Sequence, residues 1–327
     1  MYKSWLGIDV SKDKLDVVLL QSEYRLSGTF ENSDAGCKKL LGWLAHQQPV
    51  ELHACLEATG QYSLLAAQYL FQAGYCVSVV NPLRIKAYGE SRLTRNKTDR
   101  LDAFVIADFC RKQNPFLWKP PSPAIQELQA LVRYLDDLKS MRVQENNRLT
   151  SGVRSATVIQ MLQEHIVILD QQIQAVQNKI RDCINQHPEL KQQKDLLYSI
   201  PGIGDLTPAR LLAEIQDITV FENASQLAAY AGVTPRQHSS GSSVRHKSRQ
   251  SKTGNAHLRK ALYFPAIVAR KHNPIIRLHC QRLEERGKLP KVIIAASMRK
   301  LLHIAFGVLK SGKPFDPNFL SQSVVRA

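Results

Sequence analysis

The stretch that decides the fold reads Trp5-Leu6-Gly7-Ile8-Asp9-Val10, followed by the polar turn Ser11-Lys12-Asp13-Lys14 and an apolar run over 15–20. Two apolar runs separated by a short polar turn predict a pair of β-strands. Working outward, we expect further strands at 24–30, 52–56 and 77–80, and helices at 38–44, 63–71 and 98–110. Early hairpin strands followed by alternating strands and helices predict a mixed α/β sheet that is layered with helices.

The charge of the chain points to a polyanionic partner. Its 327 residues include 44 Lys and Arg against 28 Asp and Glu, a formal net charge of +16. Most of this excess lies in residues 194–327, and the segment 236–300 holds 16 basic residues but only two acidic ones, Glu284 and Glu285. A long segment of one sign, mixed with apolar helical patterns, is typical of a surface that binds nucleic-acid phosphates.

The composition also excludes several classes of protein. The longest uncharged apolar runs, such as 292–296, are far shorter than the roughly 20 residues that span a bilayer, and the first residues carry no apolar signal segment. The six cysteines are scattered without a Cys-x-x-Cys pair, which argues against a disulfide scaffold or a zinc site. We therefore expect a cytoplasmic protein without a membrane partner.

Shifts in composition divide the chain into three predicted domains, at 1–119, 120–193 and 194–327. The second follows the breaker Lys119-Pro120-Pro121-Ser122-Pro123, and from Ile159 to Cys183 its apolar residues repeat at alternating spacings of three and four. This heptad stripe predicts a long antiparallel helical hairpin with coiled-coil packing, which ends at 185–188. The hairpin serves either as an oligomerisation arm, which we favour, or as an internally packed pair of helices.

Four carboxylates form an ordered set in the first domain. Asp9 lies inside an apolar strand, Glu57 ends the apolar run 52–56, and Asp99 and Asp102 share one face at the start of a helix. A carboxylate within an apolar strand is costly unless it is ion-paired or bound to a metal. A strand Asp, a strand Glu and a helical Asp-x-x-Asp give the layout of RNase H-like (RuvC-type) nucleases. We therefore favour a site for Mg²⁺, with two ions, over ion pairs with nearby basic residues.

A second fold also opens with Gly-Ile-Asp on its first strand, namely the sugar-kinase and actin ATPase fold. It requires glycine-rich phosphate loops later in the chain, and none stands out in this sequence. It also leaves Asp99 and Asp102 without a role, so we favour the RNase H-like fold.

The third domain is predicted to be mainly helical and basic. It opens with the helix-hairpin-helix-like turn Ile200-Pro201-Gly202-Ile203-Gly204, ahead of a helix at 207–215. Such turns expose backbone N–H groups that suit a phosphate, although they also join ordinary helices. The residues that we expect to contact nucleic acid are Gly202, Gly204, Arg236, Arg245, Lys247, Arg249, Lys252, Arg259 and Lys260.

Serine, glycine and basic residues cluster in Arg236-Gln237-His238-Ser239-Ser240-Gly241-Ser242-Ser243-Val244-Arg245. On composition this segment is either a flexible polar loop or the site of a serine nucleophile that attacks a phosphodiester. His238 or His246 could then act as a base or a phosphate donor. Composition does not choose among the four serines.

Together these motifs resemble one family, the bacterial insertion-sequence transposases with an N-terminal RuvC-like DEDD domain and a C-terminal serine domain. This family is related to the Piv-type DNA invertases, and some of its members are bridge-RNA- or seekRNA-guided recombinases. The resemblance covers nearly the whole chain and is carried by the set of motifs rather than by any one. It runs through 7–9, 57–60, 96–103, 200–204, 231–236, 240–245 and 306–312.

The resemblance implies that Asp9, Glu57, Asp99 and Asp102 bind Mg²⁺. It implies that Ser240, the serine before Gly241, is the nucleophile that forms a transient phosphoserine link to DNA; Ser239 stands beside it. It also implies a noncoding guide RNA encoded by the element, and homo-oligomers (dimers or tetramers) in which the metal site of one subunit meets the serine of another.

We therefore expect an insertion-sequence transposase, a Mg²⁺-dependent site-specific recombinase that cuts and rejoins double-stranded DNA through Ser240, guided by RNA. One alternative is a RuvC-like junction resolvase that hydrolyses DNA with water, whose serine loop only binds phosphate. The other alternative is a non-catalytic nucleic-acid-binding protein. A covalent adduct with DNA separates the first alternative from our prediction, and loss of recombination on substitution of Asp9 or Asp102 separates the second.

Overall fold

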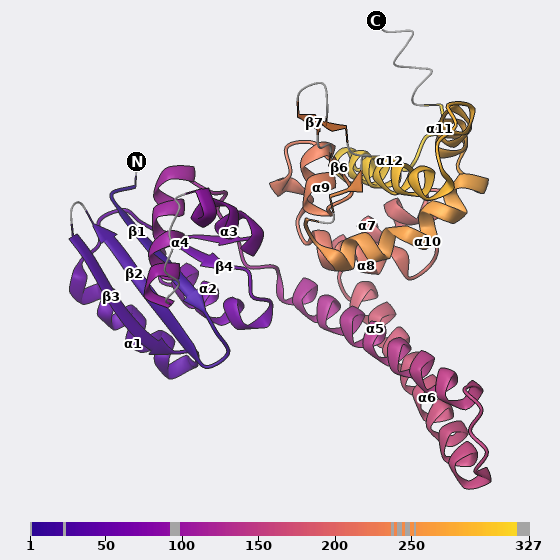
Figure 1. Cartoon of the computed structure of the whole chain (residues 1–327), viewed down its shortest axis with the longest axis horizontal. Coiled ribbons are helices and arrows are strands. Elements are labelled where there is room, and N and C mark those ends of the chain that lie inside the picture. Colours follow the sequence, from indigo (N-terminus) through magenta and orange to yellow (C-terminus); the bar gives the residue numbers. More distant parts are fainter. Residues whose placement is uncertain are drawn as a thin grey trace, which may run out of the picture. The chain divides into compact units, whose positions relative to one another are not determined.

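The structure is a computed structural model that describes residues 2–21, 24–91, 99–236, 239–240, 244–245, 249–251 and 253–318. The chain divides into two compact units, Met1–Pro120 and Pro121–Ala327 (Figure 1). The break between the units falls inside the Pro-rich segment 119–123 that marks the first predicted boundary. The division of the second unit into an arm and a basic domain stays a prediction.

The first unit is built on a five-stranded mixed sheet in the order β3-β2-β1-β4-β5. The strands are β1 (Ser4–Val10), β2 (Lys14–Gln21), β3 (Tyr24–Glu31), β4 (Leu52–Glu57) and β5 (Cys76–Val80). β1, β2 and β3 pair antiparallel, whereas β1–β4 and β4–β5 pair parallel. The predicted mixed α/β sheet is confirmed, and its architecture is consistent with a nuclease-like DEDD domain.

Helices cover both faces of this sheet, so the central strands are apolar on both sides. The helices are α1 (Asp34–Gln47), α2 (Gln61–Gln72), α3 (Pro82–Ser91) and α4 (Asp99–Gln113). Leu6, Ile8 and Val17 point to the face on which α1 and α2 pack. Val18 and Cys55 point to the other face, where α3 and α4 pack. Asp9 and Glu57 alternate with residues of the first group and therefore lie on the α4 face.

The second unit begins with two long antiparallel helices, α5 (Pro123–Thr150) and α6 (Ala156–Asn185) (Figure 1). Ser122 of the Pro-rich breaker caps α5, since its side chain accepts a hydrogen bond from the Ile125 backbone N–H. Arg142 pairs with Asp170 across the hairpin, and the Nδ1 atom of His165 lies 3.5 Å from Glu145. The second half of the predicted heptad stripe is buried in the core that α6 shares with α5, at Leu169, Ile173, Val176, Ile180 and Cys183, whereas Ile159, Leu162 and Ile166 are half-buried.

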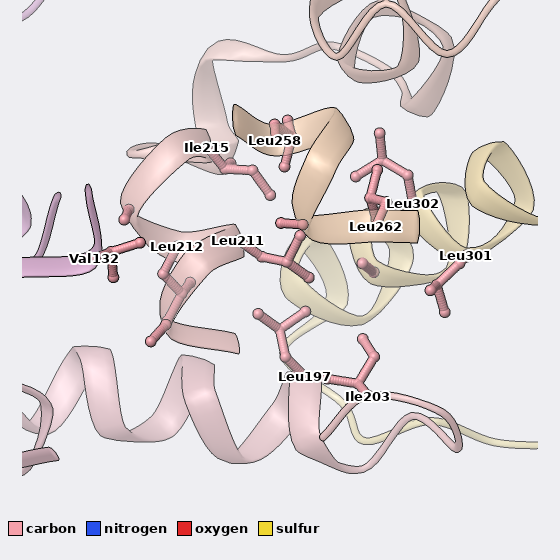
Figure 2. Packing of buried hydrophobic residues seen from close by; sticks show 14 of the residues in the cluster. Val132, Leu197, Ile203, Leu211, Leu212, Ile215, Leu258, Leu262, Leu301 and Leu302 are labelled. Atoms are coloured by element: carbon pink, nitrogen blue, oxygen red, sulfur yellow. The ribbon is translucent and has the colours of Figure 1, made fainter. Parts of the chain in front are cut away.

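Shorter helices pack around the root of this hairpin. They are α7 (Pro188–Tyr198), α8 (Thr207–Ile215), the 3₁₀ turn η1 (Ile218–Val220), α9 (Ala224–Tyr230), α10 (Ala256–His272), α11 (Pro274–Glu285) and α12 (Pro290–Ser311). Figure 2 shows Val132 of α5 beside Leu212 of α8, and Leu211 near Leu262 of α10. One continuous hydrophobic core thus joins the hairpin root to the helical body.

Within the described residues, α12 is long and apolar enough to cross a membrane by length and composition alone. Its Leu301, Leu302 and Ala305 are fully buried in the core of the second unit. The packing of a core helix therefore explains its composition.

Candidate active site

The two strand carboxylates lie near the carboxyl ends of neighbouring parallel strands, at the same edge of the sheet. β1 and β4 are in register up to Ile8 and Leu56, so Asp9 and Glu57 follow at the next position of each strand. Both residues are half-buried, unlike the fully buried Ile8 and Leu56 that precede them. Parallel strands therefore bring together two carboxylates that lie 48 positions apart in the sequence.

Helix α4 brings the third carboxylate to the same face. Gly7 lies against this helix so closely that a Cβ atom there would meet the Ala103 carbonyl oxygen at 2.1 Å and the Ala107 nitrogen at 2.3 Å. Only glycine allows a backbone approach of this kind. Asp102 immediately precedes Ala103 and is half-buried, so the contact at Gly7 carries the first turn of α4 to the strand that holds Asp9.

Asp99 is the first residue of α4, but its side chain lies outside the described part of the chain. Residues 92–98, which include the start of the predicted Asn-Lys-Thr-Asp motif, lie outside it too. The structure therefore shows that the backbone of the Asp-x-x-Asp pair starts a helix, as predicted.

The donor chemistry of this edge fits a hard divalent cation, because carboxylate oxygens are the ligands that Mg²⁺ prefers. The backbone of two strands and one helix places Asp9, Glu57 and Asp102 on one face. Among the described side chains, however, no group of three or more His, Cys, Asp or Glu residues is assembled as a metal site. The residues thus suit a cation by the chemistry of their oxygen donors and by the face of the sheet that they share.

The sequence prediction missed two charged residues on this face, Lys14 and Asp16. Asp16 is the register partner of Asp9 on β2 and is only 6% exposed. A charge inside an apolar run is the signal that could have singled it out, but the pairing with Asp9 becomes visible only once the β1–β2 register is known.

Behind the carboxylates lies a buried polar cluster. His53 is fully buried on β4, and its Nε2 atom lies 2.8 Å from Ser78 Oγ. Ser78 Oγ donates to the Phe116 carbonyl at 2.7 Å, so Nε2 is the donor to Ser78. Burial lowers the pKa of His53 to about 4. A hydrogen bond with Cys55, followed by burial, raises the pKa of the Cys110 thiol. The His53–Ser78 hydrogen bond joins β4 to β5, and the Cys110 thiol joins α4 to β4, all in uncharged form.

The serine segment folds in part as short β-ladders in the second unit. β7 (Ser239–Ser240) pairs antiparallel with β8 (Val244–Arg245), and β6 (Pro235–Arg236) pairs with β9 (Arg249–Gln250). Ser240 thus stands on a paired strand at the start of a three-residue connection, a placement that the loop interpretation missed. The structure does not describe the Ser240 side chain, nor those of Arg236, Arg245 and Arg249. Also outside the described residues are His238, Ser242, Ser243, His246, Lys247 and Lys252.

Two of the predicted phosphate contacts have partners within the protein. Arg259 donates to the Ala231 carbonyl at 3.1 Å, and Lys260 lies 3.1 Å from the Asp136 carboxylate. Gly202 has φ +103°, and a Cβ atom there would meet Ala269 of α10 at 2.5 Å, so close packing explains this glycine. Gly204 differs, because nothing lies within 4 Å of the Cβ position.

The carboxylates belong to the first unit and Ser240 to the second.

Comparison with known families covers most of both units. Residues 6–158 match the DEDD transposase domain of IS110, a family described as "Transposase". Residues 194–281 match the "Transposase IS116/IS110/IS902 family". The first match contains all four predicted carboxylates, and the second contains Ser240 and the basic segment around it.

Full-length relatives agree with these matches. The chain is 37% identical over 322 residues to a "Pilin gene-inverting protein" of Moraxella bovis, covering 97% of this chain and 98% of the relative. A protein with the same description from Moraxella lacunata is equally similar. The "Transposase for insertion sequence element IS1328" of Yersinia enterocolitica is 25% identical over 284 residues, with 76% and 81% covered.

Proposed function

The chain belongs to the IS116/IS110/IS902 transposase family, and from this premise we propose that it cuts and rejoins double-stranded DNA with a carboxylate site and a serine. Transposases act on DNA and recombine it, which places the protein among DNA-cleaving enzymes. The observation that carries the proposal is the convergence of Asp9, Glu57 and the first turn of α4 at one edge of the sheet.

In this proposal Asp9, Glu57, Asp99 and Asp102 hold Mg²⁺, with two ions. Such ions activate the attacking oxygen and stabilise the leaving oxygen in phosphoryl transfer. The protein contributes rigid placement, because Asp9 and Glu57 are fixed by paired strands and Asp102 by the glycine contact of α4. Rigid placement avoids the cost of ordering the ligands when DNA binds.

The second part of the proposal assigns the nucleophile. Ser240 Oγ attacks the phosphorus atom of a DNA strand, and the bond to the leaving deoxyribose oxygen breaks, which leaves a phosphoserine ester. A DNA hydroxyl then attacks this ester, joins the new strand and restores the serine. The family resemblance and the position of Ser240 at the start of the β7–β8 connection support this role.

We propose that the basic segment around Ser240, residues 236–252, binds DNA phosphates. The side chains of Arg236, Arg245, Lys247, Arg249 and Lys252 supply the charge, and the open Gly204 turn supplies backbone N–H groups. Arg259 and Lys260 have partners within the protein, so their contribution to DNA binding requires these partners to be exchanged. The site of action is the nucleoid of a bacterial cytoplasm.

A binding experiment distinguishes this enzyme from a non-catalytic nucleic-acid-binding protein. We expect Asp9→Asn and Glu57→Gln to retain DNA affinity within about threefold while recombination between element ends and target falls at least a hundredfold, because each removes a ligand charge from the site. Undiminished recombination by both variants would exclude the carboxylate site.

The guide RNA forms a separate part of the proposal and has a separate test. The protein is purified from cells that carry the complete element, and the RNA that copurifies is sequenced. We expect a noncoding RNA encoded at the ends of the element to be enriched. If only bulk cellular RNA is present, the protein selects DNA without a guide.

A further inference from the structure

A fifth carboxylate, Asp16, borders the proposed cation site from the other side. Asp9 has Glu57 beside it on β4 and Asp16 directly opposite on β2. Directly opposed residues of an antiparallel pair point to the same face, with Cβ atoms about 4.5–5.5 Å apart. Asp16 therefore adds a buried negative charge close to Asp9, on the face where the cation binds.

Asp16 is held by two partners on its own side of the sheet. Lys14 Nζ lies 3.0 Å from Asp16 Oδ2, and the Thr29 hydroxyl donates to Asp16 Oδ1 at 2.7 Å. The Asp16 side chain is 8% exposed, whereas that of Lys14 is 46% exposed. The carboxylate of this ion pair is therefore buried, whereas its ammonium group lies near the protein surface.

The turn before β2 fixes where this pair stands. Ser11 Oγ accepts from the Lys14 backbone N–H at 3.1 Å and donates to the Lys14 carbonyl at 3.0 Å. The Asn32 side chain donates to the Ser11 carbonyl at 2.9 Å and to the Tyr62 carbonyl at 3.0 Å, which ties the turn to α2. Lys14 therefore starts from a rigid backbone.

We propose that Lys14 and Asp16 are positioning residues for the carboxylate site: Asp16 holds a fixed ammonium charge beside Asp9, and the neutral pair sets the affinity of the site for divalent cations. The inference rests on the proposed function, since it takes Asp9 as a cation ligand. Neither residue ligates the cation; both act on it through the electrostatic field.

Because the two residues carry opposite charges, their substitutions should change the affinity for divalent cations in opposite directions. Asp16→Asn removes the negative charge and leaves the ammonium next to Asp9, so it weakens divalent cation binding. Lys14→Met leaves a buried carboxylate without its ammonium partner, so it strengthens binding. A unit charge a few ångströms from a divalent ion at a partly exposed site changes the affinity by about tenfold. The double variant is neutral again and returns the affinity to within about threefold of wild type.

The experiment uses the full chain at pH 8 and low ionic strength, with MnCl₂ as the titrant and free Mn²⁺ counted from its EPR signal. Four proteins are titrated: wild type, Asp16→Asn, Lys14→Met and the double variant. Lys39→Met is the matched control, because Lys39 is exposed on α1, which packs on the opposite face of the sheet. Thermal unfolding in chelator shows whether each variant is folded.

The expected result is weaker Mn²⁺ binding by Asp16→Asn, tighter binding by Lys14→Met, recovery in the double variant and no change in Lys39→Met. Altered unfolding temperatures with unchanged Mn²⁺ affinities would show an ordinary structural ion pair and overturn the inference. If Asp16→Asn does not fold, tighter binding by Lys14→Met alone decides. If the wild-type protein binds no Mn²⁺, or if Asp9→Asn leaves the Mn²⁺ affinity unchanged, the proposed cation site itself is overturned. That outcome is distinct from failure of the Lys14–Asp16 inference.

Discussion

At the scale of single residues, Gly7 governs how α4 meets the sheet. A methyl group there would meet the Ala103 and Ala107 backbone at little more than 2 Å. Helix α4 must then move away from β1 and take Asp102 with it.

We therefore predict that Gly7→Ala lowers the free energy of unfolding of the first unit by at least about 2 kcal/mol, the usual scale for overpacking. DNA cleavage is also lost. All three tryptophans lie in this unit, at 5, 43 and 118, so their fluorescence during urea unfolding measures the change. Gly42→Ala is the control, since nothing lies within 4 Å of its Cβ position; equal effects of the two substitutions would refute the role of Gly7.

His53 makes the stability of the first unit depend on pH. Among the described residues, its buried Nδ1 atom has no hydrogen-bond partner, so protonation there is unfavourable. The pKa of His53 is about 4 in the folded chain, compared with the ordinary 6.5. The unfolded chain therefore binds the proton more readily between these values.

It follows that His53 stabilises the folded state fully above about pH 6.5 and that this contribution is lost as the pH falls toward 4. We expect a loss of about 2–3 kcal/mol over this range. Urea unfolding followed by tryptophan fluorescence at pH 7, 6 and 5 measures it. His53→Gln should flatten the dependence, whereas exposed His46→Gln should not; an unchanged slope in His53→Gln would assign the effect to other groups.

The sequence revealed Asp9 and Glu57 because a charge within or at the end of an apolar strand is conspicuous. It did not reveal that Asp16 opposes Asp9, since that requires the strand register. It also did not show that Lys260 pairs with Asp136, which is 124 positions away in the chain. Residues within one strand or helix could thus be predicted, whereas contacts between distant elements could not.

At the scale of elements, a buried ion pair joins the hairpin to the helical body. Glu214 of α8, with a side chain only 2% exposed, lies 3.1 Å from Arg133 of α5 and also accepts from Asn255 at 2.8 Å. Removal of one partner from such a pair leaves a buried charge unmatched.

We predict that Arg133→Ala destabilises the second unit by about 3 kcal/mol, because the buried Glu214 carboxylate loses its guanidinium partner. Arg142→Ala, which removes an exposed pair with Asp170, should cost less than about 1 kcal/mol. Helical circular dichroism during thermal unfolding compares the two variants. If they unfold at the same temperature, the Glu214 network does not anchor the hairpin.

The outer part of α6 carries a second apolar stripe. Val158, Met161 and Ile168 are 42%, 63% and 49% exposed and recur at spacings of three and seven. This exposure supports the proposal that the hairpin packs against a second copy of the chain.

We therefore expect Met161→Glu with Ile168→Glu to lower the molecular mass measured by light scattering, while helicity is retained. Gln163→Glu with Gln174→Glu adds the same charge on another side of α6 and should leave the mass unchanged. If wild type is already monomeric, or if both double variants behave alike, the hairpin is not an oligomerisation arm.

Among the elements, those with strong periodicity were predicted and those that depend on packing were not. The strands of the sheet and the long α5–α6 hairpin follow the expected ranges. Helix α3 was not among the expected helices; a proline after a strand is commonly a breaker, whereas Pro82 occupies the first position of this helix. The ladders around Ser240 were missed because serine and glycine carry little strand propensity.

At the scale of the whole molecule, the two units divide the charge between them. The carboxylate unit is nearly balanced, whereas most of the net +16 lies in the last third of the chain, around Ser240. Such a division suits a reaction in which one unit holds cations and the other holds DNA phosphates. We propose that these two sites act in a single reaction.

The most direct test traps the covalent intermediate. Full-length protein is incubated with MgCl₂ and a DNA substrate whose leaving strand dissociates after cleavage, and the attached residue is mapped by mass spectrometry. We predict a DNA adduct on Ser240 that forms with Ser239→Ala but is absent with Ser240→Ala and with Asp9→Asn. An adduct that persists in Ser240→Ala, or cleavage by wild type that never leaves DNA on the protein, would contradict the account.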